Sequence, residues 1–278
     1  MAPATVLLLL AALVFGPAVR ADAGGNSGGP SYSPASIVNA AANLPGPLAP
    51  NTIASLYGVN LAYSTKGITA SDLQGGALPY VLANTGVRVW VNNIGAGIYF
   101  VSPTQVNFLV PAALAPGPAQ VVLTLDGIAG PAASVTIVPA CPALFQMNAT
   151  SVVASHADGT PVTPDAPASP GEIVVLYATG LGQTIPPVGY NEIATRATPI
   201  QNTLQVLIAG VPLDPGALLY AGLAPGFAGL YQINVQLPLD AQASPQIQLS
   251  MGGQTSPANL ILPLQAQPAD NTTGVAVK

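Results

Sequence analysis

Apolar and polar residues alternate along most of this chain, from about Ser36 to Leu264, in short segments separated by glycine, proline and asparagine. Short alternating segments with turn residues between them are typical of antiparallel β-sandwiches. Helical periodicity is weak throughout this region. The pattern predicts strands at residues 53–57, 87–91, 97–101, 105–110, 120–125, 134–138, 173–177, 204–208, 217–220, 230–237, 246–251 and 259–262.

The sequence repeats itself in three ordered blocks, and the copies lie 120, 127 and 126 residues apart. The paired blocks are 49–61 with 169–181, 105–111 with 232–238, and 123–131 with 249–257. Three blocks in one order indicate an internal duplication. We therefore predict an all-β protein of two tandem immunoglobulin-like β-sandwich lobes, residues 36–139 and 140–264. The two prolines of Pro139–Pro142 make a short, stiff joint, so we expect the lobes to pack on each other.

The two ends of the chain have a different character. Residues 1–21 have the form of a secretory signal peptide, because the apolar run Thr5–Gly16 is too short for a membrane span and small residues follow it. The alternative is a buried N-terminal strand. Residues 22–35 are a Gly/Ser/Pro linker that we expect to be too flexible to pack, and 265–278 are expected to be a disordered tail.

The composition limits the cellular compartments and the kinds of partner that are compatible with the sequence. The 29 glycines and 30 prolines disfavour long helices, and no later segment is apolar for long enough to span a membrane. Five basic and ten acidic residues leave no basic patch for nucleic acid. The single cysteine, Cys141, excludes an intramolecular disulfide. We expect a secreted protein, either extracellular or on the cell surface, with the periplasm as the alternative.

Several motifs resemble one known family. They include Leu56–Leu61 in the first copy, and Pro142–Phe145, Leu176–Gly182, Tyr220–Gly226 and Gly229–Val235 in the second. This set is similar to the uncharacterised Solibacter-type extracellular C-terminal domain of acidobacterial exported proteins, over about Ser36 to Leu264. The family also resembles immunoglobulin-like modules of the IPT/TIG type. The resemblance implies a fold and export, and it carries no activity or catalytic residues.

The chain has few residues for acid–base, nucleophilic or metal chemistry: one histidine, one cysteine and two glutamates. His156 lies near Asp158, but Asp158-Gly159 is typical of a hairpin turn and no nucleophile accompanies the pair. The aspartates are scattered singly, so they form no calcium loop, and zinc lacks ligands. We therefore predict no enzyme activity, no catalytic residues, no cofactor and no metal.

Two polar pairs occupy matching positions in the two copies: Gln105 with Asn107, and Gln232 with Asn234. Each pair shares one face of its strand, where it would bond a neighbouring loop or form a ladder for a glycan. The aligned tyrosines Tyr57 and Tyr177 are expected to be core rings whose hydroxyls reach a turn carbonyl.

Arg88 and Trp90 are the candidate ligand-binding residues. In the segment 87–91 the valines share the inner face, which places Arg88 and Trp90 outward. Trp90 is interpreted either as packing against the other lobe or an overlying loop, which we favour, or as an exposed platform for a sugar ring or partner protein.

These observations predict an exported, non-enzymatic interaction protein for cell-surface or matrix adhesion or assembly. The alternative is a carbohydrate-binding module for extracellular polysaccharide. The partners are accordingly a protein or a polysaccharide, and the sequence does not determine the oligomeric state. A cluster of solvent-facing aromatic side chains in the folded protein would favour the carbohydrate-binding alternative.

Overall fold

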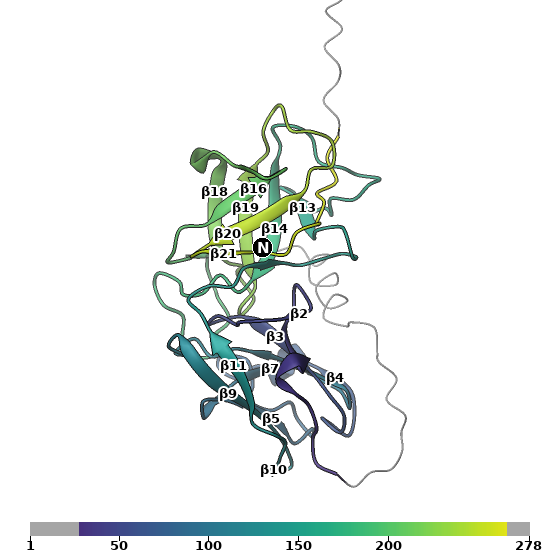
Figure 1. Cartoon of the computed structure of the whole chain (residues 1–278), viewed down its shortest axis with the longest axis vertical. Coiled ribbons are helices and arrows are strands. Elements are labelled where there is room, and N and C mark those ends of the chain that lie inside the picture. Colours follow the sequence, from purple (N-terminus) through teal and green to yellow (C-terminus); the bar gives the residue numbers. More distant parts are fainter. Residues whose placement is uncertain (1–27, 266–278) are drawn as a thin grey trace, which may run out of the picture.

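The computed structural model describes residues 28–265, in which the regular elements are β-strands and three short 3₁₀ turns (Figure 1). The turns are η1 (Pro34–Ser36), η2 (Ala70–Asp72) and η3 (Pro215–Ala217). Strands β1 to β11 form the first lobe and β12 to β21 form the second, and each lobe consists of two antiparallel sheets. The predicted all-β class and tandem immunoglobulin-like lobes are confirmed.

The first lobe pairs its strands in two sheets. One sheet has the order β2 (Leu44–Pro45), β1 (Ile37–Asn39), β3 (Ile53–Tyr57), β8 (Gln105–Leu109), β7 (Gly97–Val101) and β4 (Lys66–Gly67). The other has the order β10 (Ile128–Ala129), β9 (Gly117–Leu125), β5 (Val87–Val91) and β6 (Ile94–Gly95), with β11 (Ala133–Ile137) also on β9.

The second lobe repeats this arrangement. One sheet has the order β12 (Ala143–Leu144), β14 (Ile173–Thr179), β19 (Tyr231–Gln236), β18 (Leu218–Leu223) and β15 (Thr198–Pro199), with β13 (Ala154–His156) on β14. The other has the order β17 (Val211–Pro212), β16 (Gln205–Ile208), β20 (Ile247–Met251) and β21 (Gln254–Thr255).

Strand register shows how closely the lobes correspond. Tyr57 lies opposite Gln105 on β8, and Tyr177 lies opposite Gln232 on β19. The register of β7 on β8 shifts at Tyr99, and that of β18 on β19 shifts at the matching residue, Leu219. Because aligned residues have equivalent partners and equivalent bulges, the sequence repeat is a structural repeat.

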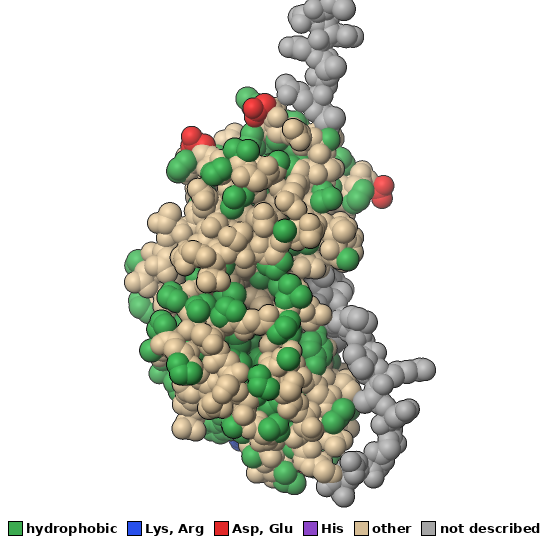
Figure 2. Space-filling model, viewed as in Figure 1, with side chains coloured by type: hydrophobic (Ala, Val, Ile, Leu, Met, Phe, Trp, Pro, Cys, Tyr) green, Lys and Arg blue, Asp and Glu red, His purple; other side chains and the backbone are tan. Residues whose placement is uncertain are grey.

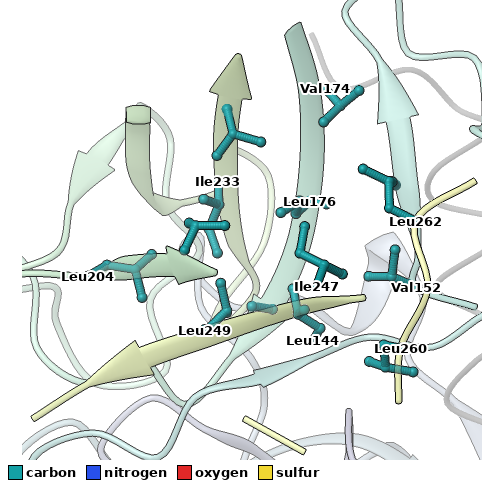
Figure 3. Close-up of a cluster of buried hydrophobic side chains, with 14 of the residues drawn as sticks. Leu144, Val152, Val174, Leu176, Leu204, Ile233, Ile247, Leu249, Leu260 and Leu262 are labelled. Atoms are coloured by element: carbon teal, nitrogen blue, oxygen red, sulfur yellow. The ribbon is translucent and has the colours of Figure 1, made fainter. Parts of the chain in front are cut away.

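Each lobe buries its apolar residues between its two sheets. On β5 the burial alternates, with Val87, Val89 and Val91 buried and the residues between them exposed. Figure 3 shows the core of the second lobe, where Leu176 and Ile233 of one sheet face Ile247 and Leu249 of the other. Burying each such side chain contributes about 1.5–3 kcal/mol, so sheet packing is the main source of stability in a protein without a disulfide.

One predicted strand is wrong. Residues 259–262 form no regular strand, because only Ile261 makes isolated bridges, to Ser151 and Gln246. Leu260 and Leu262 are nevertheless buried, which explains their apolar character.

The structure also corrects the linker prediction where it describes that segment. Ser31 pairs with Val59 by two backbone hydrogen bonds of 3.0 Å. The buried Tyr32 hydroxyl accepts a hydrogen bond from the backbone N–H of Leu123 at 2.7 Å. An aromatic ring and a backbone pairing therefore hold a stretch whose composition suggested flexibility. The predicted signal peptide, the rest of the linker, and the tail beyond Gln265 lie outside the described residues.

The lobes pack end to end, as the short joint predicted. A third apolar cluster lies between them, and it includes Ile53 and Leu109 of the first lobe and Phe145, Tyr177 and Leu230 of the second. The backbone N–H of Ile53 donates to Thr179 Oγ1 at 2.9 Å, and that hydroxyl donates to the carbonyl of Gly229 at 2.7 Å. Tyr99 donates its hydroxyl proton to the carbonyl of Ala228, and burial raises the pKa of this tyrosine.

A loop of the second lobe extends this contact along the side of the first. The carbonyl of the buried Asn191 accepts a hydrogen bond from Leu78 N–H at 2.9 Å. The side-chain oxygen of Asn191 accepts a second bond, from Gly97 N–H, also at 2.9 Å. These bonds fix the loop that carries Tyr190 beside the segment that carries Tyr80.

Candidate binding surface

Arg88 and Trp90 lie on the outer face of β5, as the alternation predicted. Trp90 is 36% exposed and belongs to none of the three apolar clusters, including the one between the lobes. The favoured interpretation offered two neighbours for Trp90. An overlying loop is present, as the segment that carries Tyr80, whereas packing against the other lobe is wrong. The cause is the end-to-end arrangement, which uses the ends of the sheets and leaves the outer face of β5 open.

A tyrosine shares the open face with Trp90. Gly95 on β6 lies directly opposite Trp90, and Tyr80 is 46% exposed. A Cβ atom added to Gly95 would lie 2.8 Å from Tyr80 Cδ1 and 3.7 Å from Trp90 Cζ3. The missing side chain of Gly95 therefore makes room for two aromatic rings at one point of the surface.

The hairpin between β5 and β6 fixes the position of this point. Its two turn residues, Asn92 and Asn93, have φ angles of 48° and 63°, the conformation of the tightest β-hairpin turns. The side-chain oxygen of Asn92 also accepts a hydrogen bond from Gln120 N–H at 2.8 Å. A tight, bonded turn sets the register of Trp90 on Gly95 and so positions the ring before any ligand arrives.

Tyr190 is a third exposed aromatic residue near this face. It precedes Asn191, which is bonded to Leu78, and Leu78 is two residues before Tyr80. Sequence reasoning missed Tyr80 and Tyr190 because both lie in loops, where no alternation marks the outward positions. The one signal in the sequence was Gly95, because a glycine opposite Trp90 leaves room for another ring, which is that of Tyr80.

The second lobe has no such surface. In matching register, Gln205 and Leu207 of β16 replace Arg88 and Trp90, and Pro212 of β17 replaces Gly95. The duplicated fold is therefore shared, whereas the aromatic group belongs to the first lobe alone. This surface, defined by Tyr80, Arg88, Trp90 and Gly95, is called the aromatic surface below.

His156 has a different partner from the one that its neighbours in sequence suggested. Its Nδ1 lies 2.5 Å from Glu172 Oε1, and its Nε2 lies 3.2 Å from the carbonyl of Ala166. The hydrogen bond to the Glu172 carboxylate raises the pKa of His156. Asp158 instead accepts bonds from the backbone and hydroxyl of Thr160, which lower its pKa and close the predicted turn.

The repeated polar pairs bond internally. Gln105 donates to Asn107 Oδ1 at 2.9 Å, and Gln232 donates to Asn234 Oδ1 at 2.8 Å. Gln105 and Asn107 are both buried, which excludes a glycan ladder on β8.

The aligned tyrosines also differ from expectation. Their hydroxyl groups bond side chains and not turn carbonyls. The hydroxyl of Tyr57 donates to Asn43 Oδ1 at 3.0 Å, and the hydroxyl of Tyr177 lies 3.3 Å from Ser155 Oγ. The Tyr177 ring is buried against the first lobe, whereas the Tyr57 ring is only partly buried.

Residues 28–265 contain no group of three or more His, Cys, Asp or Glu side chains that could hold a metal ion. Over the same residues there is no helix with the length and apolarity that a bilayer crossing demands. Cys141 is a free thiol at the joint, and burial raises its pKa.

Neither a family model nor a curated protein matches this chain. Among solved structures, it is similar to the surface glycan-binding protein PbSGBP-B from Prevotella bryantii, with 13% identity and a TM-score of 0.27, over 77% of this chain and 37% of that one. It is also similar to SGBP-B from a mixed-linkage glucan utilization locus of Bacteroides ovatus, with 11% identity and a TM-score of 0.31, over 79% of this chain and 42% of that one. A titin immunoglobulin tandem matches at 10% identity and a TM-score of 0.22, over 84% of this chain and 91% of that one.

The chain therefore spans less than half the length of the two glycan-binding proteins. Similarity at these TM-scores is too weak to indicate a function for this chain. Its resemblance to the Solibacter-type family stays an expectation.

Proposed function

We propose that this chain is an exported, non-enzymatic binding protein whose first lobe binds a neutral extracellular polysaccharide at the aromatic surface. The single observation that carries the proposal is the pair of solvent-facing rings, Tyr80 and Trp90, which meet over Gly95. Aromatic faces carry negative charge density, which attracts the C–H groups on the face of a sugar ring. Two adjacent rings on a rigid hairpin offer a platform for neighbouring sugars of a chain.

Arg88 adds directional hydrogen bonding to this platform. It lies two residues from Trp90 on the same face of β5, and its guanidinium offers five N–H donors to sugar hydroxyl groups. The combination of stacking rings and a polar donor at their edge is typical of binding sites that fix an orientation.

The charge of the protein favours a neutral ligand. Ten acidic residues against five basic ones give the chain a formal net charge of −5. The net charge of the whole chain repels a polyanionic polysaccharide at long range, although the described part of the first lobe has balanced charge. A neutral polysaccharide binds through shape, stacking and hydrogen bonds.

Adhesion or assembly through protein contacts, the other function predicted from the sequence, is supported by different residues. These residues lie at the two ends of the molecule. The two functions can coexist, because they use different residues.

The proposal is tested by native affinity electrophoresis in gels that contain xyloglucan, mixed-linkage β-glucan, galactomannan or dextran. We expect at least one of these neutral polymers to retard the wild-type protein. Trp90→Ala should abolish the retardation with an almost unchanged melting temperature, because the ring is partly exposed and lies outside the apolar clusters. Leu207→Ala, at the matching position of the second lobe, is the control and should bind as wild type does.

Salt separates stacking from charge. Retardation by the neutral polymer should change little between low and high ionic strength, because no screened ion pair contributes the main binding energy. The proposal fails if none of the four polymers retards the wild type, or if Trp90→Ala and Leu207→Ala bind equally well.

A further inference from the structure

The contact between the lobes uses one end of the first lobe, and three of its residues define that end. Ile53 donates its N–H to Thr179, Tyr99 donates its hydroxyl proton to the carbonyl of Ala228, and the carbonyl of Ala112 accepts a bond from Gln183. Ile53 and Ala112 are buried.

The same end of the second lobe is uncovered. The strand register makes Ile173 the counterpart of Ile53 and Leu219 the counterpart of Tyr99, and Leu239 follows Gln232 at the interval that separates Ala112 from Gln105. All three counterparts are large apolar side chains exposed to solvent, and Leu239 is 74% exposed. The repeat thus presents its lobe-binding end a second time, with nothing bound among the described residues.

This end also carries a groove. A cavity of about 560 Å³ lies between the β16–β17 hairpin, η3 and the segment that follows β19. Its lining includes Val211, Leu213 and Leu239, with Asp214 and Asp240 also contributing. Such a groove is large enough to receive an aromatic side chain from a partner.

The opposite end of the first lobe has the complementary property. In the second lobe the residues that contact the first include Thr179 and Gln183, and their counterparts are Val59 and Tyr63. Both counterparts are exposed to solvent, and Tyr63, with 70% of its surface exposed, is more exposed than Val59. These two residues place an exposed apolar and an exposed aromatic side chain at the free end of the first lobe. The β18–β19 hairpin, which supplies Ala228 and Gly229 to the internal interface, is longer than the β7–β8 hairpin, so this free end has no counterpart of those two residues.

We propose that the exposed end of the second lobe binds the opposite end of the first lobe of another copy of this chain, so that copies associate head to tail. The contact uses the same two ends as the contact within one chain, but without the hydrogen bond from Ile53 N–H to Thr179 Oγ1, because Val59, the counterpart of Thr179, has no hydroxyl group. An interface between two different surfaces of identical molecules does not close on itself unless the rotation forms a ring, so the product is an open chain of copies. This inference is independent of the aromatic surface, which lies on neither end.

Charge disfavours the other self-association, in which two second-lobe ends meet. Among residues 28–265, the first lobe has two basic and two acidic side chains, whereas the second has one basic residue, Arg196, and six acidic ones. Figure 2 shows acidic side chains at the free end of the second lobe. An end-to-end contact between second lobes would bring Asp214 and Asp240 against their own copies, whereas a first lobe presents balanced charge.

Sedimentation velocity on the purified chain, from about 1 µM to about 500 µM, tests the proposal. The wild type should show dimers and longer species that grow with concentration. Leu239→Asp and Tyr63→Asp should each weaken association at least about ten-fold, since each places a charge in the contact. Leu44→Asp, an exposed leucine on β2 beside the joint, is the matched control and should associate as wild type does.

Mixing the two variants identifies the geometry. Each variant retains one intact end, so an equal mixture should form dimers that do not grow further. The proposal is overturned if the wild type stays monomeric throughout, or if Tyr63→Asp associates as well as wild type, which would indicate contact between second lobes. If the wild type is monomeric and begins to associate once residues 266–278 are deleted, that segment is identified as the occupant of the groove, and the proposal is overturned in the same way. Trp90→Ala should associate normally, so failure here is distinguishable from failure of polysaccharide binding.

Discussion

Individual side chains distinguish two lobes that share one fold. Trp90 and Leu207 occupy matching positions on the outer faces of β5 and β16, yet only Trp90 has a glycine opposite it and a tyrosine beside it. The difference of a few side chains gives the first lobe a surface for stacking and leaves the second without one. The aromatic surface is therefore a local feature placed on a duplicated scaffold.

The His156–Glu172 pair makes stability depend on pH. Because the carboxylate of Glu172 raises the pKa of His156 in the folded state, protonated His156 stabilises the fold. This contribution is fully present below the ordinary histidine pKa of 6.5 and is lost as the pH rises through the raised value. Melting curves of wild type and His156→Gln, measured between about pH 5 and pH 9, should therefore differ more at the acidic end.

Glu172→Gln is the control for this prediction. It removes the carboxylate that raises the pKa and should reduce the pH dependence in the same direction as His156→Gln. The account of the pair is contradicted if the difference between wild type and His156→Gln is the same at both ends of the range.

At the scale of elements, glycine decides how closely the lobes approach. Gly229, in the β18–β19 hairpin, has a φ of 66°, and a Cβ atom there would lie 2.3 Å from Leu109 Cδ1 and 2.5 Å from the carbonyl oxygen of Asn51. Gly226 in the same hairpin has a φ of 92° and no neighbour within 4 Å of such a Cβ. Both glycines have a positive φ angle, and only Gly229 lies against the other lobe.

Gly226→Ala should lower the free energy of unfolding by about 1–2 kcal/mol, the usual cost of a side chain in a left-handed conformation. Gly229→Ala should lower it by a further 1–3 kcal/mol or so, because the methyl group overpacks the joint. Chemical denaturation of both variants measures the difference. Equal losses would show that the lobes do not rely on this close approach.

The sequence predicted regular elements better than their docking. Strands β3, β5 and β7 begin and end where the sequence pattern placed them. On β5 the cause is alternation with one face on the core, whereas β3 and β7 are short, mainly apolar segments that are buried on both faces. Short pairs such as β4 and β15 were missed, since two residues carry no alternation. Ser31 and Tyr32 were missed because glycine and serine around them concealed a single buried ring.

The candidate site was predictable only in part, for the same physical reason. Alternation on β5 was sufficient to place Arg88 and Trp90 outward. Whether the outer face stays open depends on which ends of the lobes meet, and that depends on contacts such as Thr179 with Ile53, more than a hundred residues apart. No local pattern contains that information.

At the scale of the whole molecule, the two lobes stack into an elongated unit (Figure 1). The ends are an acidic, apolar-lined groove on the second lobe and an exposed Tyr63 on the first, and the aromatic surface belongs to the first lobe. If copies join head to tail, each one contributes one aromatic surface to the assembly. Weak individual sites would then combine into stronger attachment to a polymer, because neighbouring sites bind at high effective concentration.

Hydrogen–deuterium exchange with and without the polysaccharide that retards the protein tests the binding site most directly. We expect slower exchange in peptides that cover Tyr80 and the β5–β6 hairpin, residues 87–95. The matching β16–β17 hairpin, residues 205–212, should not change when the Leu239→Asp variant is used, because this variant removes the association in which that hairpin lines the groove. Protection confined to the second lobe, or bound polymer with no protection at residues 80–95, would contradict the proposed function.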